Sequence, residues 1–264
     1  MECVSTSVDE IGHELASVKL EEKFVDDLPV RLFKGVDLIT AESILLFMYN
    51  LGAVMAGSFV ARLFFPEWKP NDIDLFVPAG GDANDIQVRQ VVGGLAQSME
   101  WIEQTDVFRD TTENYVCEHC IGSMRFSTPA RGFDTAMKHL SINVIFYFSK
   151  NQQQLIESIR QSFDFDGCAI IFDGKKIIMP PCTSDADFLA GKWIIRPHSV
   201  CPIIEQWPLA QLKWNAHVEN MHPRFQLSLA KMRRTRVSRI KKYMARGITF
   251  PNAIDIILEL LGAD

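Results

Sequence analysis

The sequence predicts an α/β or α+β fold, in which a mixed sheet flanked by helices is followed by a smaller helical region. Two observations carry this prediction. Segments with strand-like and helix-like patterns alternate over the first 180 residues, and only helical patterns follow them. In addition, 47% of the 264 residues are hydrophobic, which provides for a large core and excludes wholesale disorder.

Each predicted element depends on a local pattern. A helix over 41–51 takes Thr40 as its N-cap, and a short apolar strand over 53–56 runs into Gly57-Ser58. Helical periodicity continues over 59–65 until Pro66 stops it. The remaining predicted elements are, in order, a strand at 72–77, a helix at 83–105, short strands within 111–134, a strand at 140–148, a helix at 152–162, a strand at 168–172, its hairpin partner at 176–179, and helices at 185–190, 230–245 and 252–261.

These elements divide the chain into three parts: a loose N-terminal arm at 1–20, a sheet domain at 21–180 and a helical region at 181–264.

Every apolar run is shorter than the roughly 20 residues that a membrane span needs, and the N-terminus is too acidic for a secretion signal. Six cysteines are too sparse for a disulfide framework. We therefore expect an intracellular, cytoplasmic protein with reduced thiols; the sequence leaves its oligomeric state open.

The most informative pattern is a strand that ends in Gly57-Ser58 and is followed, after thirteen intervening residues, by Asp72-Ile-Asp74. A glycine lets a phosphate approach the backbone, and a serine at the start of a helix offers hydrogen-bond donors to it. Side chains alternate along a strand, so Asp72 and Asp74 are expected on one face, close enough to share a divalent ion. Mg²⁺ binds through one or two carboxylates plus the phosphates of a substrate.

This pattern resembles that of the nucleotidyltransferase superfamily with the DNA polymerase beta-like fold. In that superfamily an apolar residue precedes Gly and then Gly or Ser, and an acid-apolar-acid strand follows after about a dozen residues. The resemblance covers roughly residues 38–179. It implies transfer of a nucleotidyl group from an NTP to a hydroxyl acceptor with Mg²⁺ or Mn²⁺. Gly57 and Ser58 would hold the phosphates, and Asp72 and Asp74 the metal.

The resemblance also implies a third acid on a later strand. The expected strand at 141–145 carries Asn143 instead, and an amide is neither a general base nor a strong metal ligand. Asp166, or else Asp164, is our candidate for the third, catalytic acid, delivered from a neighbouring strand. The alternative is that both are ordinary solvated acids at the entry of a strand.

Two further segments resemble poorly characterised nucleotidyltransferase-like proteins of fungi and large viruses. Residues 162–174 contain Phe-Asp, a cysteine and an aromatic-Asp-Gly turn, and residues 239–247 contain Lys-Tyr, two residues and Arg-Gly. The resemblance implies the same fold, but no reaction is established for that group. The alternative function is therefore a catalytically inactive module that binds nucleic acid or acts in assembly, which Asn143 also suits.

A basic segment is the third feature, since residues 221–253 hold nine Lys or Arg and no acid in a chain of net charge −6. Cationic side chains at this density contact the phosphates of RNA, DNA or a nucleotide. The alternative is a solvated helix that packs against the acidic remainder of the chain. The candidate nucleic-acid ligands are Arg233, Arg234, Arg236, Arg239, Lys241 and Lys242.

A zinc site is a weaker hypothesis. Cys117 and Cys120, with His217 and His222, have the pair spacings of a Cys2His2 site. Almost a hundred residues separate the two pairs, however, so we favour free buried cysteines and a surface histidine, and the sequence leaves zinc binding by Cys117 and Cys120 open.

Overall fold

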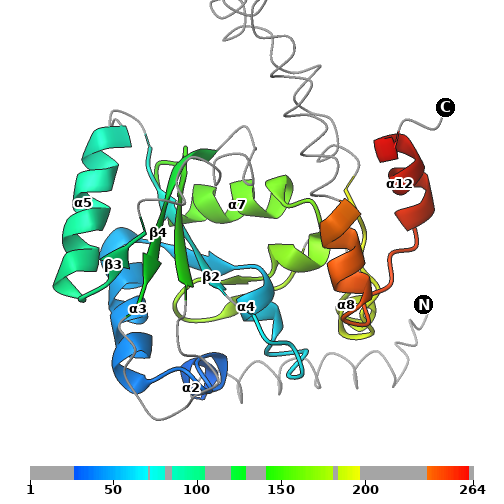
Figure 1. Cartoon of the computed structure of the whole chain (residues 1–264), viewed down its shortest axis with the longest axis horizontal. Coiled ribbons are helices and arrows are strands. Elements are labelled where there is room, and N and C mark those ends of the chain that lie inside the picture. The colour runs from blue at the N-terminus through cyan, green and yellow to red at the C-terminus, as the bar shows by residue number, and fades with distance from the viewer. Residues whose placement is uncertain are drawn as a thin grey trace, which may run out of the picture.

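A mixed sheet of seven strands, in the order β3-β4-β5-β2-β1-β6-β7, forms the centre of the computed structural model (Figure 1). The model describes residues 27–70, 72–80, 85–104, 120–128, 141–180, 184–196 and 237–261. The strands are β1 Val54–Ala56, β2 Asp72–Pro78, β3 Ile102–Glu103, β4 Cys120–Ser127, β5 Ser141–Tyr147, β6 Ile171–Phe172 and β7 Ile177–Ile178. Helices flank this sheet, so the predicted fold class is confirmed.

Strands β2 and β5 pair in parallel, whereas every other pairing between the described strands is antiparallel. In this register Asp74 of β2 stands between Ala56 of β1 and Asn143 of β5. Arg125 of β4 lies on the far side of Asn143. The start of β2, where the two acids are, is therefore at the middle of the sheet.

Two layers of helices cover the two faces of the sheet (Figure 1). Side chains alternate along each strand, so that Leu75 and Val144 pack in the core shared with α3 and α5, while Phe76 and Ile145 pack under α7. None of the helices in the described part of the chain has the length and apolar character needed to cross a bilayer. The helices are α2 Leu28–Leu32, α3 Leu38–Leu51, α4 Ser58–Ala61, α5 Asp85–Ser98, α7 Gln152–Ser162, α8 Asp185–Leu189, α12 Ala253–Leu261 and the helix at 237–244, with the 3-10 turn η3 Asp166–Ala169.

An aromatic cluster joins the C-terminal elements to the end of the sheet that carries β1 and η3. Trp193 is fully buried, stacks on Phe188 and meets Phe65 edge-on, each with ring centroids 5.8 Å apart. A Cβ at Gly167 would lie 2.1 Å from the Trp193 ring, so this close packing requires glycine. The helix at 237–244 adds Tyr243 to the same cluster. The predicted boundary at residue 180, between a sheet domain and a helical region, stays a prediction.

The structure moves several predicted boundaries. Helix α3 begins three residues early because Asp37 caps it, its carboxylate accepting the Thr40 N–H at 2.9 Å, so Thr40 lies inside the helix. The first two residues of the predicted strand at 168–172 belong to the turn η3, and only its last two residues form β6. The predicted helix at 83–105 ends at Ser98. The predictions for 1–20 and 230–236 fall outside the described residues.

Candidate functional site

The acid pair, Asp72 and Asp74, opens β2, and both residues are half-buried. The Nδ2 of Asn143, on the neighbouring strand, donates to Asp74 Oδ1 at 2.8 Å and to Asp72 Oδ2 at 3.3 Å. Because one amide reaches both carboxylates, the two acids share one face of the sheet, as strand alternation predicts. The amide also reduces the repulsion between them by placing two N–H donors in the gap.

The Gly57-Ser58 turn lies against the acid pair. Gly57 has a φ of +87° between β1 and α4, and a Cβ there would come within 3.3 Å of Asp74 Oδ2. A side chain at this position would thus be strained and would crowd the carboxylate. The Gly57 N–H already donates to the Cys168 carbonyl at 3.1 Å, whereas the half-buried Ser58 hydroxyl has no hydrogen-bond partner among the described residues. Of the two, Ser58 retains a donor for a ligand.

The donor set fits a divalent cation that is shared with a phosphate ligand. Within the described ranges, no three His, Cys, Asp or Glu side chains come together as a metal cluster. Mg²⁺ is ordinarily held by only one or two carboxylates, with water and substrate phosphates completing its shell. Asp72 and Asp74 meet that requirement. Asn143 would have to rotate its amide to offer Oδ1 as a further oxygen ligand.

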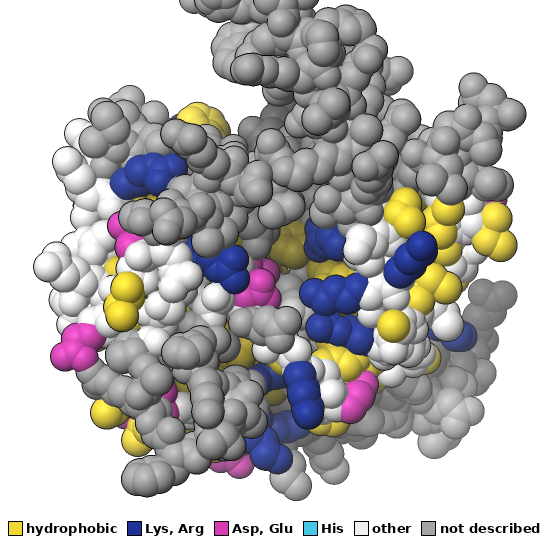
Figure 2. Space-filling model, in the orientation of Figure 1, with side chains coloured by type: hydrophobic (Ala, Val, Ile, Leu, Met, Phe, Trp, Pro, Cys, Tyr) yellow, Lys and Arg dark blue, Asp and Glu magenta, His cyan; other side chains and the backbone are white. Residues whose placement is uncertain are grey.

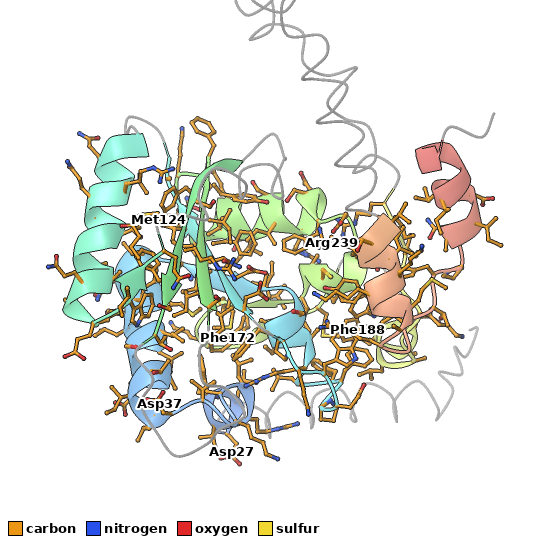
Figure 3. All side chains as sticks on the ribbon, in the orientation of Figure 1. Asp27, Asp37, Met124, Phe172, Phe188 and Arg239 are labelled. Atoms are coloured by element: carbon orange, nitrogen blue, oxygen red, sulfur yellow. The ribbon has the colours of Figure 1, made fainter. Side chains whose placement is uncertain are left out.

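Asp164 is engaged elsewhere. It is buried, and its Oδ2 lies 2.7 Å from the Nη1 of Arg239, while Oδ1 accepts the Phe165 N–H at 3.1 Å. The Arg239 guanidinium also lies over the Phe165 ring, 5.2 Å from its centroid. Arg239, labelled in Figure 3, lies between the helix at 237–244 and the end of α7. This ion pair therefore connects the helix at 237–244 to the segment before η3.

Asp166, the candidate third acid, is the first residue of η3 and is fully buried. Its Oδ1 accepts the backbone N–H of Gly167 at 2.7 Å and of Ile194 at 2.8 Å. Burial raises the pKa of this carboxyl, although both hydrogen bonds and the charge of Arg196 oppose the shift. These contacts give Asp166 a structural role in the turn, and its catalytic role stays a prediction.

The cations in the described part of the basic segment differ in their surroundings. Arg239 is paired with Asp164 and Arg246 is half-buried, whereas Lys241 and Lys242 are exposed. Partial burial, and then the charge of Arg246, lower the pKa of Lys242, while the charge of Asp72 opposes the shift, so the charges of Lys242 and Asp72 interact. Figure 2 shows Lys and Arg side chains where Figure 1 draws this helix, beside an acidic patch near the centre. The candidates Arg233, Arg234 and Arg236 lie outside the described residues.

The zinc hypothesis also falls largely outside the described residues. Cys117, His217 and His222 are not among them, and of Cys120 only its place in β4 is known. The preference for free cysteines stays a prediction.

Sequence reasoning missed Arg125. Arg125 lies on β4 as the register partner of Asn143, on the side away from the acid pair. Its Nε and Nη2 donate to Ser141 Oγ at 3.2 and 3.0 Å. A signal was present, because Ser123, Arg125 and Ser127 alternate with the buried Met124 and Phe126. Only the strand order, however, places this polar face beside Asp74.

No protein-family model and no curated protein matches the sequence. Similar solved structures include the Thermotoga maritima CCA-adding enzyme complexed with tRNA, at 14% identity and a TM-score of 0.48, over 88% of this chain and 44% of that chain. Another is a CCA-adding enzyme in complex with CTP, at 12% identity and a TM-score of 0.42, over 81% of this chain and 54% of that chain. The chain thus spans about half the length of either. Its reaction has to be inferred from its own residues, and the resemblance to fungal and large-virus proteins stays a prediction.

Proposed function

We propose that this chain belongs to the nucleotidyltransferases, binds an NTP with Mg²⁺ or Mn²⁺ at the acid pair, and transfers the nucleotidyl group to a hydroxyl acceptor. One observation carries the proposal: two half-buried carboxylates stand side by side on the central strand, against a Gly-Ser turn with positive φ. The sequence resemblance implies this combination of turn and acid pair for that reaction.

Each residue of the site has a distinct task in this proposal. Asp72 and Asp74 hold the divalent cation, which when bound stabilises the negative charge of the phosphates. Gly57 keeps the space beside Asp74 open, and the Ser58 hydroxyl donates to a phosphate oxygen. Lys242, whose charge interacts with that of Asp72, supplies a positive charge to the same phosphates.

Asn143 favours a second candidate function, a catalytically inactive module that binds a nucleotide or nucleic acid or acts in assembly. It occupies the place where the resemblance implies a third acid, and it donates to both acids of the pair. An amide takes no proton from an attacking hydroxyl. In this candidate function the site binds its ligand but catalyses no nucleotidyl transfer.

A binding and transfer assay separates the two candidates. The parent is titrated with Mg²⁺ and mixed NTPs by calorimetry, and transfer from labelled NTPs to mixed RNA is measured in parallel. The double variant Asp72→Asn/Asp74→Asn should lose NTP binding, because neutral amides no longer hold the cation. Transfer by the parent supports the enzyme, whereas binding without transfer supports the inactive module.

The chain provides a matched control for this assay. Asp185 and Asp187 have the same spacing at the start of α8 and are exposed, so Asp185→Asn/Asp187→Asn removes the same two charges elsewhere. This variant should bind NTP like the parent. A parent that binds no NTP, or equal losses in the two double variants, rejects the proposed site.

A further inference from the structure

We propose that the hydroxyl acceptor carries a phosphate of its own, and that Arg125 binds it. The inference rests on the proposed function and names the class of its second substrate. A mononucleotide and the end of a nucleic acid strand share this chemistry. An acceptor without phosphate, such as an unmodified protein or a simple sugar, does not.

The sheet places Arg125 at a fixed position relative to the acid pair. In the strand register, Asp74 is beside Asn143, and Asn143 is beside Arg125. The three side chains leave the same face of the sheet in one row. Two strand spacings, roughly 10 Å, separate the backbones of Asp74 and Arg125. A ligand of nucleotide size spans that distance.

The Arg125 guanidinium is held in place but forms no direct ion pair with the residues that the structure describes. Its Nε and Nη2 donate to Ser141 Oγ, and Ser141 is the register partner of Asp72, so the guanidinium lies over β5 beside the acid pair. Arg125 is half-buried and has no carboxylate partner among the residues that the structure describes. Partial burial of a charge is unfavourable unless an opposite charge accompanies it. The planar guanidinium fork matches a phosphate group.

Cations flank the acid pair on opposite sides. Lys242 comes from the helix that packs on η3, and η3 is bonded to Gly57, so this cation and the Gly57-Ser58 turn share the β1 side of the acid pair. Arg125 comes from the β5 and β4 side. Figure 2 shows Lys and Arg side chains on both sides of the acidic patch near the centre.

This arrangement separates two anionic ligands. The phosphates of the NTP occupy the side of the turn and Lys242, where the proposed function places them. The acceptor hydroxyl has to approach across the acid pair from the other side, where Arg125 lies. The phosphate that pairs with Arg125 therefore belongs to the acceptor. Beyond it, Gln104 Nε2 donates to Ser127 Oγ at 3.1 Å, which continues the polar surface to the edge of the sheet.

Two phosphate-bearing probes test the inference in the presence of a saturating, non-hydrolysable Mg-ATP analogue. Single-stranded RNA of mixed sequence with a fluorescent label is followed by anisotropy, and AMP is followed by calorimetry, with adenosine as the probe that lacks phosphate. Arg125→Gln should weaken the binding of at least one phosphate probe about tenfold, the loss expected for one charge-assisted contact. Binding of the ATP analogue itself should not change.

The matched control is Arg89→Gln. Arg89 is also half-buried and also donates to an oxygen of β4, the Ser123 carbonyl, but it lies in α5 on the other face of the sheet. This variant should bind both probes like the parent. If Arg125→Gln does not fold, Arg125→Lys and Ser141→Ala decide instead. The first keeps the charge without the fork and the second removes the hydroxyl that orients it, so each should weaken binding several-fold.

The outcomes separate this inference from the proposed function. A loss confined to the Arg125 and Ser141 variants supports the inference, and the probe affected identifies a mononucleotide or a strand end as the acceptor. Equal binding in parent and variants, no binding of either probe, or adenosine binding as well as AMP overturns it while NTP binding stands. A parent that binds no ATP analogue refutes the proposed function instead.

Discussion

The chain contains two Asp-x-Asp sequences, Asp72-Ile-Asp74 and Asp164-Phe-Asp166, and the aspartate side chains of the two have different surroundings. The first lies on a regular strand, so both side chains leave one face, half-buried and joined by a single amide. The second lies where the chain leaves α7 and enters η3, and its side chains diverge. One meets Arg239 and the other meets two backbone N–H groups.

The difference teaches that spacing alone does not make a metal site. The two pairs differ in burial and in the kind of partner that the fold supplies. Asp164 and Asp166 are buried with partners from distant segments, and they hold the structure together. Asp72 and Asp74 are only half-buried and share the side-chain amide of Asn143, and we propose that they bind a cation.

The largest expected effect is on stability, at the second pair. Asp166→Ala leaves the N–H groups of Gly167 and Ile194 buried and unpaired, which should lower the free energy of unfolding by about 3 kcal/mol. Asp166→Asn keeps an oxygen acceptor and should lose less. Urea denaturation measures both. A stable Asp166→Ala protein that lacks transfer activity would instead make Asp166 the third catalytic acid.

A smaller loss, this time in binding, is expected at the first pair. Asp74→Asn should weaken Mn²⁺ binding about a hundredfold, since loss of a ligand exceeds the 10- to 100-fold cost of losing its supporting residues. Stability should hold or rise slightly because a like-charge repulsion disappears. Mn²⁺ paramagnetic resonance and a melting curve measure the two effects. Asp187→Asn, at an exposed acid, is the control for binding and should leave the Mn²⁺ affinity unchanged. Its stability should fall slightly, because Asp187 pairs with Lys192 at 3.7 Å.

Asn143→Asp should increase cation binding about tenfold by adding a third carboxylate to the pair, an effect of about 1.4 kcal/mol. Without metal, the variant should be less stable, because the two hydrogen bonds from Nδ2 are replaced by repulsion. Mn²⁺ should restore the lost stability through linkage. A variant whose Mn²⁺ affinity equals that of the parent would show that Asn143 does not face the cation.

The smallest effect concerns pH. Because the pKa of Lys242 is lowered, mainly by burial, its ammonium should lose its proton at a lower pH than an ordinary lysine. The charged form attracts phosphate, so affinity for Mg-ATP should fall as the pH rises through that lowered pKa, by a few-fold. In Lys242→Arg the charge persists, and the affinity should stay level over the same alkaline range. Parallel decline in both proteins would exclude Lys242 as a phosphate ligand.

Local patterns were sufficient for much of the fold. The acidic start and apolar continuation of 72–77 predicted β2, and the helix over 152–162 was predicted with the bounds that α7 has. The N-cap of α3 was misassigned because Asp37 and Thr40 both suit that place, and only the helical conformation of Thr40 decides between them. Short elements such as β6 depend on their partners in the sheet and have little pattern of their own.

The candidate site divides in the same way. The acid pair, its glycine turn and Asn143 were identified from the sequence because each lies in a short segment with a periodic pattern. The partners of Asp166 and Asp164 are 28 and 75 residues away, at Ile194 and Arg239, and no local pattern indicates them. Arg125 is placed beside the site only by the order of the strands in the sheet, and the sequence does not determine that order.

The parallel pairing of β2 with β5 also has a consequence for how the protein folds. Asp74 and Asn143 are 69 residues apart, so a growing chain contains both acids long before the amide that separates them. Pairing of distant strands is slow, and the β5 side of β2 stays open until it occurs. A nascent chain that ends before β5 would therefore present an apolar strand edge, and such edges template aggregation. Completion of the site and protection of that edge are the same late event.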